Sequence, residues 1–201
     1  KLVINKDKPG TNVTGSSDLN PIGAQLDLIM QFVPNAKTIG TIYNSSEINS
    51  QFQVEILKKE LARYNVTLVE GTVSSVNDVQ QVAQGLIGKI DALYVPTDNI
   101  IASAMPVLTK ITTPAKVPVI TGEEGPLHGG GLATVGVDYY ELGKIAGNMG
   151  ADILEGKAKP ADMPIQYQKE FKVKVNEPVL KTLGLQLPES LKGKAELGDF
   201  H

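Results

Sequence analysis

Short apolar segments alternate with longer amphipathic segments along most of the chain. Expected strands lie at 38–43, 66–71, 90–95 and 117–121. Apolar residues at helical spacing predict helices over about 21–33, 48–64, 79–87 and 100–112. This alternating order predicts an α/β fold in which helices flank a parallel sheet on both faces.

The pattern changes after the glycines at 129–131. An extended segment at 132–137 leads into a helix that ends near Gly156. The partial alternation at 166–175 predicts an antiparallel or edge strand, followed by a short helix to Leu183. The polar tail from Pro188 is expected to be mobile. In the helix over 48–64, the expected buried stripe is Phe52, Ile56, Leu57 and Leu61.

Composition narrows the classes of function. A chain of 201 residues with 41% hydrophobic content can bury one sizeable core. A net charge of −3 and dispersed lysines argue against a nucleic-acid partner. Cysteine is absent and there are only two histidines, so we expect no thiol chemistry, no metal site and no cofactor. No apolar run approaches the roughly 20 residues that cross a bilayer.

Polar side chains follow the expected strand at 90–95. Thr97, Asp98 and Asn99 stand where that strand passes into the next helix. In a parallel sheet, the carboxyl ends of the strands share one edge, and ligands bind in the crevice at that edge. The three residues either cap the helix or contact a ligand, in which case Asp98 would pair with an amino group.

A second polar cluster follows the strand at 38–43. Asn44, Ser45, Asn49 and Ser50 form either a capped loop or a set of hydroxyl, amide and helix N-terminal N–H groups around a ligand carboxylate. Tyr43, next to them, packs in the core or against an aromatic ligand.

Acidic residues mark the remaining candidate positions. Glu123 and Glu124 resemble a catalytic carboxylate pair, but adjacent loop residues point apart, so Glu123 is interpreted as a single ligand acceptor. Ser17 and Asp18 cap a helix or border the cleft. Asp138 is the natural cap of its helix, with a ligand role as the alternative.

Several motifs resemble a known family. They are NVTG at 12–15, YN at 43–44, YVPTDN at 94–99, GVDYYELG at 136–143 and the linker at 157–164. Their order and spacing are similar to those of the substrate-binding proteins of ABC uptake transporters, in the group linked to tryptophan and related aromatic amino acids.

The resemblance implies a periplasmic-binding-protein fold of the first type, which traps a small ligand between two lobes by hinge closure. It also implies an ABC permease as partner and an extracytoplasmic location, either periplasmic or as a cell-surface lipoprotein. Because family members carry a first lobe ahead of the position matching Lys1, we expect this chain to supply the second lobe.

This implies a division of the chain. Residues 1–17 would be an entry crossover, 18–135 with 164–190 the second lobe, 136–163 a crossover helix that packs on the first lobe, and 191–201 a tail. The apolar face of that helix, with Ile145, Met149 and Ile153, would then be exposed and could support a dimer.

Other classes stay open at this stage. One is the effector-binding domain of a transcriptional regulator, which would need a DNA-binding segment. Another is a protein that binds a sugar or a nucleobase. An enzyme would need a nucleophile, a base or a phosphate loop at a strand end, and no such residue stands out, so no catalytic residue is predicted.

Overall fold

The computed structural model describes residues 2–200 and contains two compact units. Unit 1 comprises Lys1–Asn20 and Val137–Phe171, and unit 2 comprises Pro21–Gly136 and Lys172–His201. The chain passes between them at 20/21, 136/137 and 171/172. The sequence-based division assigned 18–20 and 164–171 to the larger part, whereas these residues belong to unit 1.

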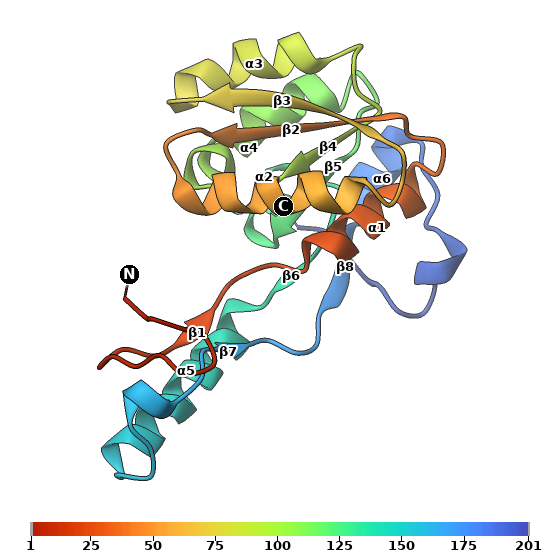
Figure 1. The fold of residues 1–201 in the computed structure, drawn as a ribbon. Coiled ribbons are helices and arrows are strands. Elements are labelled where there is room, and N and C mark those ends of the chain that lie inside the picture. The colour runs from red at the N-terminus through yellow and green to blue at the C-terminus, as the bar shows by residue number, and fades with distance from the viewer. Residues whose placement is uncertain (1, 201) are drawn as a thin grey trace. The chain divides into compact units, whose positions relative to one another are not determined.

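Unit 2 is built on one sheet with the strand order β3-β2-β4-β5-β6-β8-β9 (Figure 1). The strands are β2 (Thr38–Asn44), β3 (Thr67–Val73), β4 (Ala92–Val95), β5 (Val119–Glu123), β6 (Ala133–Val137), β8 (Lys172–Asn176) and β9 (Glu196–Gly198). β2 pairs in parallel with β3 and β4, and β4 with β5. The predicted α/β fold with a parallel sheet is confirmed.

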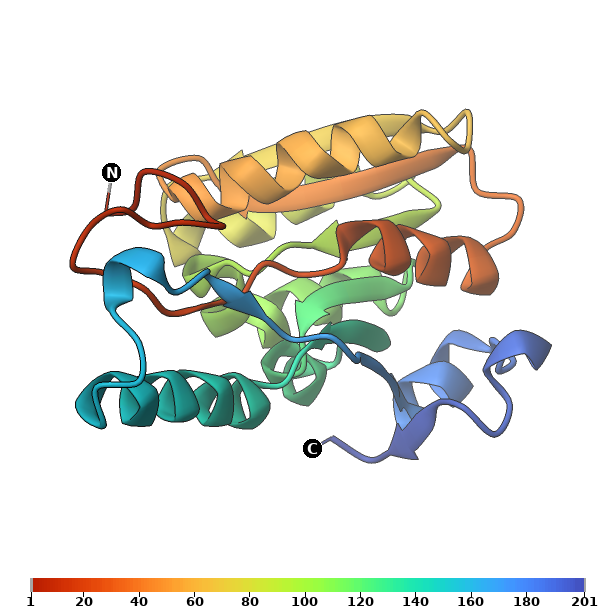
Figure 2. The same ribbon diagram turned by 60° about the horizontal axis from the view of Figure 1, so that its bottom comes forward.

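Helices cover both faces of this sheet (Figures 1 and 2). They are α1 (Ile22–Phe32), α2 (Ile48–Leu61), α3 (Val79–Leu86) and α4 (Asn99–Thr112), with α6 (Glu177–Leu183) after β8. Alternation along β4 shows the two layers. Leu93 and Val95 pack in one cluster with residues of α3 and α4, whereas the hydroxyl of Tyr94 reaches Gln25 of α1. The short 3-10 helices are η1 (Val76–Asp78), η2 (Gly125–Gly129), η3 (Pro160–Asp162) and η4 (Glu189–Leu191).

The buried stripe of α2 differs from the predicted one. Its buried residues are Ser50, Gln53, Val54, Leu57 and Leu61. The prediction for Phe52 is wrong, since this side chain is 51% exposed. Positions 50, 53, 54, 57 and 61 share one helical face, and two of them are polar. An apolar pattern alone could not find that face.

The C-terminal tail belongs to the fold, and the prediction that it is mobile is wrong. β9 pairs in parallel with β8 at the end of the sheet. Leu191 and Phe200 are buried, and the ring of Phe200 lies edge-on to His128 with the ring centroids 6.0 Å apart. Without β9, one edge of β8 would expose unpaired backbone N–H and C=O groups. Pairing with β9 satisfies these groups and so holds the tail in the fold.

The alternation at 166–175 covers two separate strands. β8 pairs with β6 in the antiparallel sense, as predicted. The first part is β7 (Gln166–Tyr167), which pairs in parallel with β1 (Ser16–Ser17) inside unit 1. The break in the alternation between Tyr167 and Lys172 therefore marks the place where the chain passes from unit 1 to unit 2.

Unit 1 consists of the N-terminal segment, β7 and the helix α5 (Tyr139–Leu154). The backbone N–H of Ile165 donates to the carbonyl of Lys6, and that of Gly10 to Ala161, so the segment runs beside residues 161–165. β1 and β7 both contact α5.

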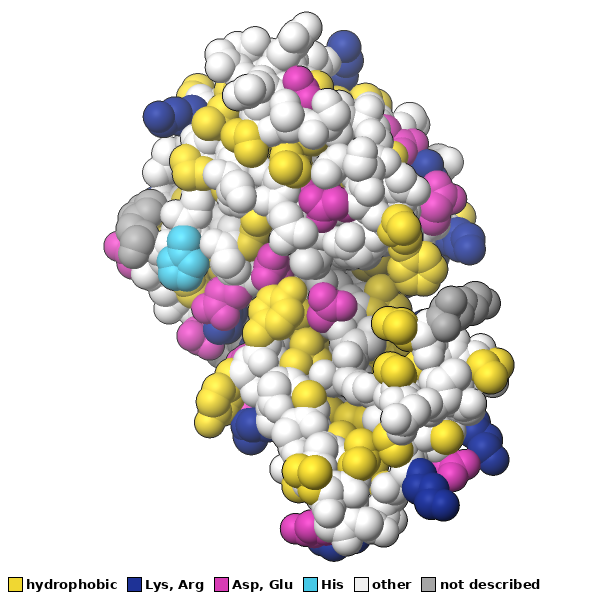
Figure 3. Space-filling view, turned by 90° about the vertical axis from the view of Figure 1, so that its left-hand side faces the viewer, with side chains coloured by type: hydrophobic (Ala, Val, Ile, Leu, Met, Phe, Trp, Pro, Cys, Tyr) yellow, Lys and Arg dark blue, Asp and Glu magenta, His cyan; other side chains and the backbone are white. Residues whose placement is uncertain are grey.

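These contacts cover the apolar face of α5 that was expected to be exposed. Met149 is buried, and Ile145 and Ile153 are half-buried. The large apolar side chains that α5 does expose are Tyr139, Tyr140 and Leu154. Figure 3 shows hydrophobic side chains, in yellow, reaching the surface on one side of the molecule.

Candidate ligand-binding site

The parallel strands of unit 2 bring three predicted residues together at their carboxyl ends. The Asp98 carboxylate accepts from the backbone N–H of Asn44 at 2.7 Å and from the Ser50 hydroxyl at 2.7 Å. Its second oxygen accepts from the N–H of Ile101 at 3.0 Å, which caps α4. Asp98 is 2% exposed. One carboxylate therefore joins the end of β2, the first turn of α2 and the start of α4.

The peptide of Thr97 is held by side chains from α2. Its carbonyl accepts from Asn49 Nδ2 at 2.9 Å, from Ser50 Oγ at 3.3 Å and from Gln53 Nε2 at 3.4 Å. Its N–H donates to Gln53 Oε1 at 3.1 Å. Gln53, which the sequence analysis did not select, is 5% exposed. The segment between β4 and α4 is thus fixed by one face of α2.

A second residue that the sequence analysis missed is Glu47. Its carboxylate accepts from the backbone N–H and the side-chain amide of Asn99, at 3.2 and 3.0 Å, and from the amide of Asn44 at 3.3 Å. Burial alone would raise the pKa of Glu47, but these hydrogen bonds and one from the N–H of Ile100 outweigh it and lower the pKa. Glu47 therefore lies as an anion at the N-terminus of α4.

Tyr43 and Ser45 lie apart from this cluster. The Tyr43 hydroxyl donates to Glu70 Oε2 on β3 at 3.0 Å. Burial, followed by the hydrogen bond to Glu70, raises the pKa of Tyr43. Ser45 is exposed, and its N–H donates to the carbonyl of Val73. The hydrogen-bond partners of both residues therefore lie on β3, and neither residue contacts Asp98 through these bonds.

The end of β5 approaches the Thr97 segment closely. A Cβ atom on Gly122 would lie 2.9 Å from the Thr97 nitrogen and 3.1 Å from the Pro96 carbonyl carbon. Glu123, the next residue, is half-buried. Its neighbour Glu124 pairs with Lys174 at 2.6 Å.

The other predicted residues belong to unit 1. The Ser17 hydroxyl accepts from the N–H of Leu19 at 3.3 Å, and Asp18 is exposed. Asp138 caps α5 by accepting from the N–H groups of Tyr140 and Glu141, at 2.9 and 3.2 Å.

Asn20, which the sequence analysis did not select, ties two of the unit boundaries together. It is 5% exposed, and its Oδ1 accepts from the N–H of Val137 at 3.1 Å.

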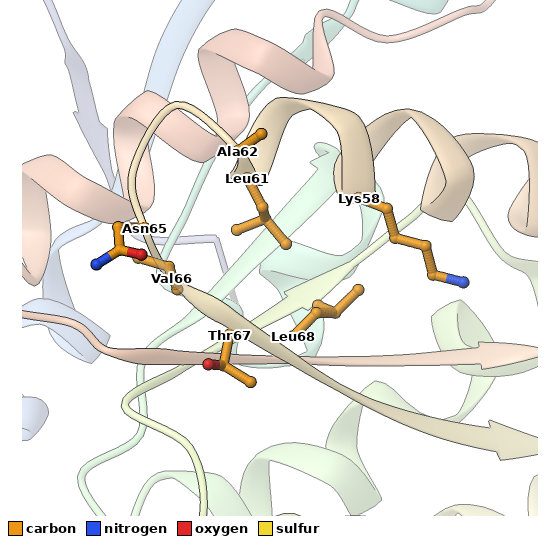
Figure 4. A pocket seen from close by; sticks show the side chains of 7 residues that line it. All are labelled: Lys58, Leu61, Ala62, Asn65, Val66, Thr67 and Leu68. Atoms are coloured by element: carbon orange, nitrogen blue, oxygen red, sulfur yellow. The ribbon is translucent and has the colours of Figure 1, made fainter.

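A pocket of about 410 Å³ lies at the opposite edge of the unit 2 sheet, where strands begin (Figure 4). It is lined by Lys58, Leu61, Ala62, Asn65, Val66, Thr67 and Leu68. Its one charged side chain, Lys58, pairs with Glu55 and Glu70. These partners, Glu55 first, raise the pKa of Lys58 despite some desolvation. The lining is poor in groups that could orient a polar ligand.

Residues 2–200 contain no group of three histidine, aspartate or glutamate side chains arranged to hold a metal ion. None of the helices in this described range is long and apolar enough to cross a membrane. The strand-end cluster around Asp98 is rich in hydrogen-bond donors and acceptors, an arrangement suited to binding.

Comparison with known proteins identifies the family. The family model for ABC transporter substrate binding proteins matches residues 1–197. The chain belongs to this family. A tyrosine-binding protein from Clostridioides difficile (strain R20291) is 43% identical over 185 residues, which cover 92% of this chain and 53% of that protein.

Two solved structures resemble this substrate binding protein closely. One is the ABC domain in complex with L-Trp from Streptococcus pneumonia, with a TM-score of 0.89 and 38% identity. The other is the ligand-free, open structure of CD0873, a substrate binding protein with adhesive properties from Clostridium difficile, with a TM-score of 0.82 and 42% identity. Each alignment covers 98% of this chain and 66% of the other chain.

The substrate binding protein spans about half the length of the curated relatives it matches. The family to which the chain belongs is one of substrate binding proteins, a class that is not enzymatic. A solute binding protein with bound D-allose and several LacI family regulators, at 9–18% identity, share the fold alone. The fold is thus of the periplasmic-binding-protein type.

Proposed function

We propose that this chain captures an aromatic amino acid, tyrosine or tryptophan, for an ABC importer. The observation that carries the proposal is the convergence of Asn44, Ser50 and Asp98 at one edge of the unit 2 sheet. In α/β sheets, ligands bind at this edge. The relatives named for tyrosine and for L-Trp support the ligand class.

Accessible groups at this edge are the proposed contacts. Thr97 and Glu123 are half-buried and Asn99 is exposed, so a ligand can reach them. Ser17, Asp18 and Asp138, which belong to unit 1, stay predicted ligand contacts. Tyr43 and Ser45 stay predicted contacts as well, although the Tyr43 hydroxyl and the Ser45 N–H donate toward β3.

The family supports the rest of the proposal. Substrate binding proteins of this type hold the ligand between two lobes and deliver it to an ABC permease. They act outside the cytoplasm, either as periplasmic proteins or as lipoproteins at the cell surface. Because the chain covers 66% of its solved relatives, we propose that a first lobe completes the cleft.

A copy of this chain is a second proposed partner. It would pack on the exposed side of α5, where Tyr139, Tyr140 and Leu154 are 49%, 75% and 90% exposed. Light scattering tests this proposal, and the mass of a single chain at high concentration would contradict it.

Amide chemical shifts measured during ligand titration test the ligand proposal. L-tyrosine or L-tryptophan should shift the amide signals at 44–50 and 97–99, whereas a sugar and a nucleobase should not. Shifts confined to residues 58–68 would place the site in the pocket of Figure 4 instead. Shifts caused by the sugar alone would overturn the ligand class.

A further inference from the structure

Residues 96–98 are held from two sides. On one side, Asn49, Ser50 and Gln53 bind both polar groups of the Thr97 peptide. On the other side, Gly122 lies so close that its missing side chain leaves room for the Thr97 nitrogen. The position of this segment therefore depends on α2 and β5 together.

The polar atoms on the α2 side are already used inside the protein. Ser50 is 0% exposed and Gln53 is 5% exposed. Gln53 donates to the Thr97 carbonyl, and the single Ser50 hydroxyl proton is shared between Asp98 and that carbonyl. Asp98 uses both carboxylate oxygens on three protein donors and is 2% exposed. A ligand could reach these atoms only by displacing existing hydrogen bonds.

Burying such groups is unfavourable unless every hydrogen bond is made, so an apolar stripe would stabilise α2 more simply. Unlike an apolar stripe, a fully satisfied polar network holds the segment in a single geometry, because its hydrogen bonds are directional. A segment held in its bound geometry also binds with less loss of conformational entropy.

We propose that Ser50, Gln53 and Asp98 are positioning residues, which set the place of the Thr97 segment and do not touch the ligand. This assignment rests on the proposed function, because it concerns the same edge of the sheet. It changes the predicted roles of Ser50 and Asp98 from ligand contacts to supports of Thr97 and Asn99, and Asn49, which is exposed, stays a predicted ligand contact.

The test uses ligands that differ in one charged group. L-tyrosine carries an ammonium and a carboxylate, tyramine lacks the carboxylate, and 3-(4-hydroxyphenyl)propionate lacks the ammonium. A residue that touches the ammonium affects only the two ligands that carry it. A positioning residue affects all ligands that bind, by a similar factor.

The variants are Gln53→Met, which keeps length and removes the polar atoms, and Asp98→Asn, which removes the charge. Gln80→Met, at an exposed position of α3, is the matched control. Amide hydrogen exchange at Thr97 and Ile101 reports whether the segment is held, and calorimetry with each ligand gives the affinity.

We expect Gln53→Met to raise the exchange rate at Thr97 at least tenfold and to weaken each ligand that binds by about the same factor. Asp98→Asn should raise exchange at Ile101 and weaken the ligands equally, and Gln80→Met should change neither. Faster exchange at Thr97 with unchanged affinity would overturn the assignment, as would a loss confined to the ligands that carry the ammonium or to those that carry the carboxylate. Gln53→Met decides the matter if Asp98→Asn does not fold.

If the unaltered protein binds none of the three ligands, the proposed function fails and the ligand-positioning role fails with it. Exchange at Thr97 would still respond to Gln53→Met, so this result is distinct from a failure of the positioning residues themselves.

Discussion

Asp98→Ala removes the carboxylate that joins β2, α2 and α4. Three donors lose their partner at once, namely the N–H of Asn44, the hydroxyl of Ser50 and the N–H of Ile101. Asp98 and Ser50 are almost fully buried, so water cannot easily replace the lost bonds.

The magnitude follows from the three contacts. Loss of the cap on α4 costs about 1 kcal/mol. The buried N–H of Asn44, left without a partner, costs about 2 kcal/mol. Ser50 costs less, about 0.5–1 kcal/mol, because its hydroxyl can still donate to the Thr97 carbonyl. The sum is about 3.5–4 kcal/mol, a large part of the stability of an ordinary domain.

Urea unfolding followed by far-ultraviolet circular dichroism measures this loss. Asp138→Ala is the matched control, because Asp138 caps α5 in the same way but is exposed, and its loss should cost about 1 kcal/mol. If Asp98→Ala costs no more than Asp138→Ala, the three contacts do not act together and the reasoning is wrong.

Three further predictions use other contacts of unit 2. Because the fold lowers the pKa of Glu47, the Glu47 carboxylate contributes to stability above its ordinary pKa of 4.5, and this contribution is lost on acidification. Glu47→Gln should therefore flatten the fall in the free energy of unfolding between about pH 5 and pH 3. Gly122→Ala should cost about 1–3 kcal/mol in urea unfolding, since the new Cβ meets the Thr97 backbone. Tyr94→Phe should cost about 1–3 kcal/mol, because it leaves the buried Gln25 Oε1 without its donor at 2.7 Å.

Each of these has a result that would contradict it. An unchanged pH profile would show that Glu47 is not held as an anion at α4. Full stability of Gly122→Ala would mean that the Thr97 segment yields easily, which also weakens the positioning argument. For Tyr94→Phe, the control is Tyr140→Phe at a 75% exposed position, and equal effects would argue against the buried hydrogen bond.

The sequence predicted the sheet and the meeting of polar residues at its edge for a simple reason. Alternation with short links forces parallel strands, and parallel strands end on one side. Asn44 and Asp98 are 54 positions apart, yet their contact follows from this rule. The cap on α4 is equally local, because Asp98 directly precedes the helix.

The residues that were missed depend on contacts across the fold. Gln53 stands inside α2 and is buried only because the β4–α4 segment passes over it, which no local pattern reveals. Glu47 precedes α2 but binds the start of α4, so its position in the sequence suggests the wrong helix. Phe52 was chosen for its apolar side chain, while the buried face contained polar residues instead.

The C-terminal strand matters for anyone who shortens or tags this protein. A version cut at Pro188 would lose β9 and Phe200. The backbone of β8 would then form an exposed edge of the sheet that can pair with another chain. Such a version would be prone to precipitate during purification even though every proposed ligand contact is present. A version that retains residues 188–200 keeps that edge paired.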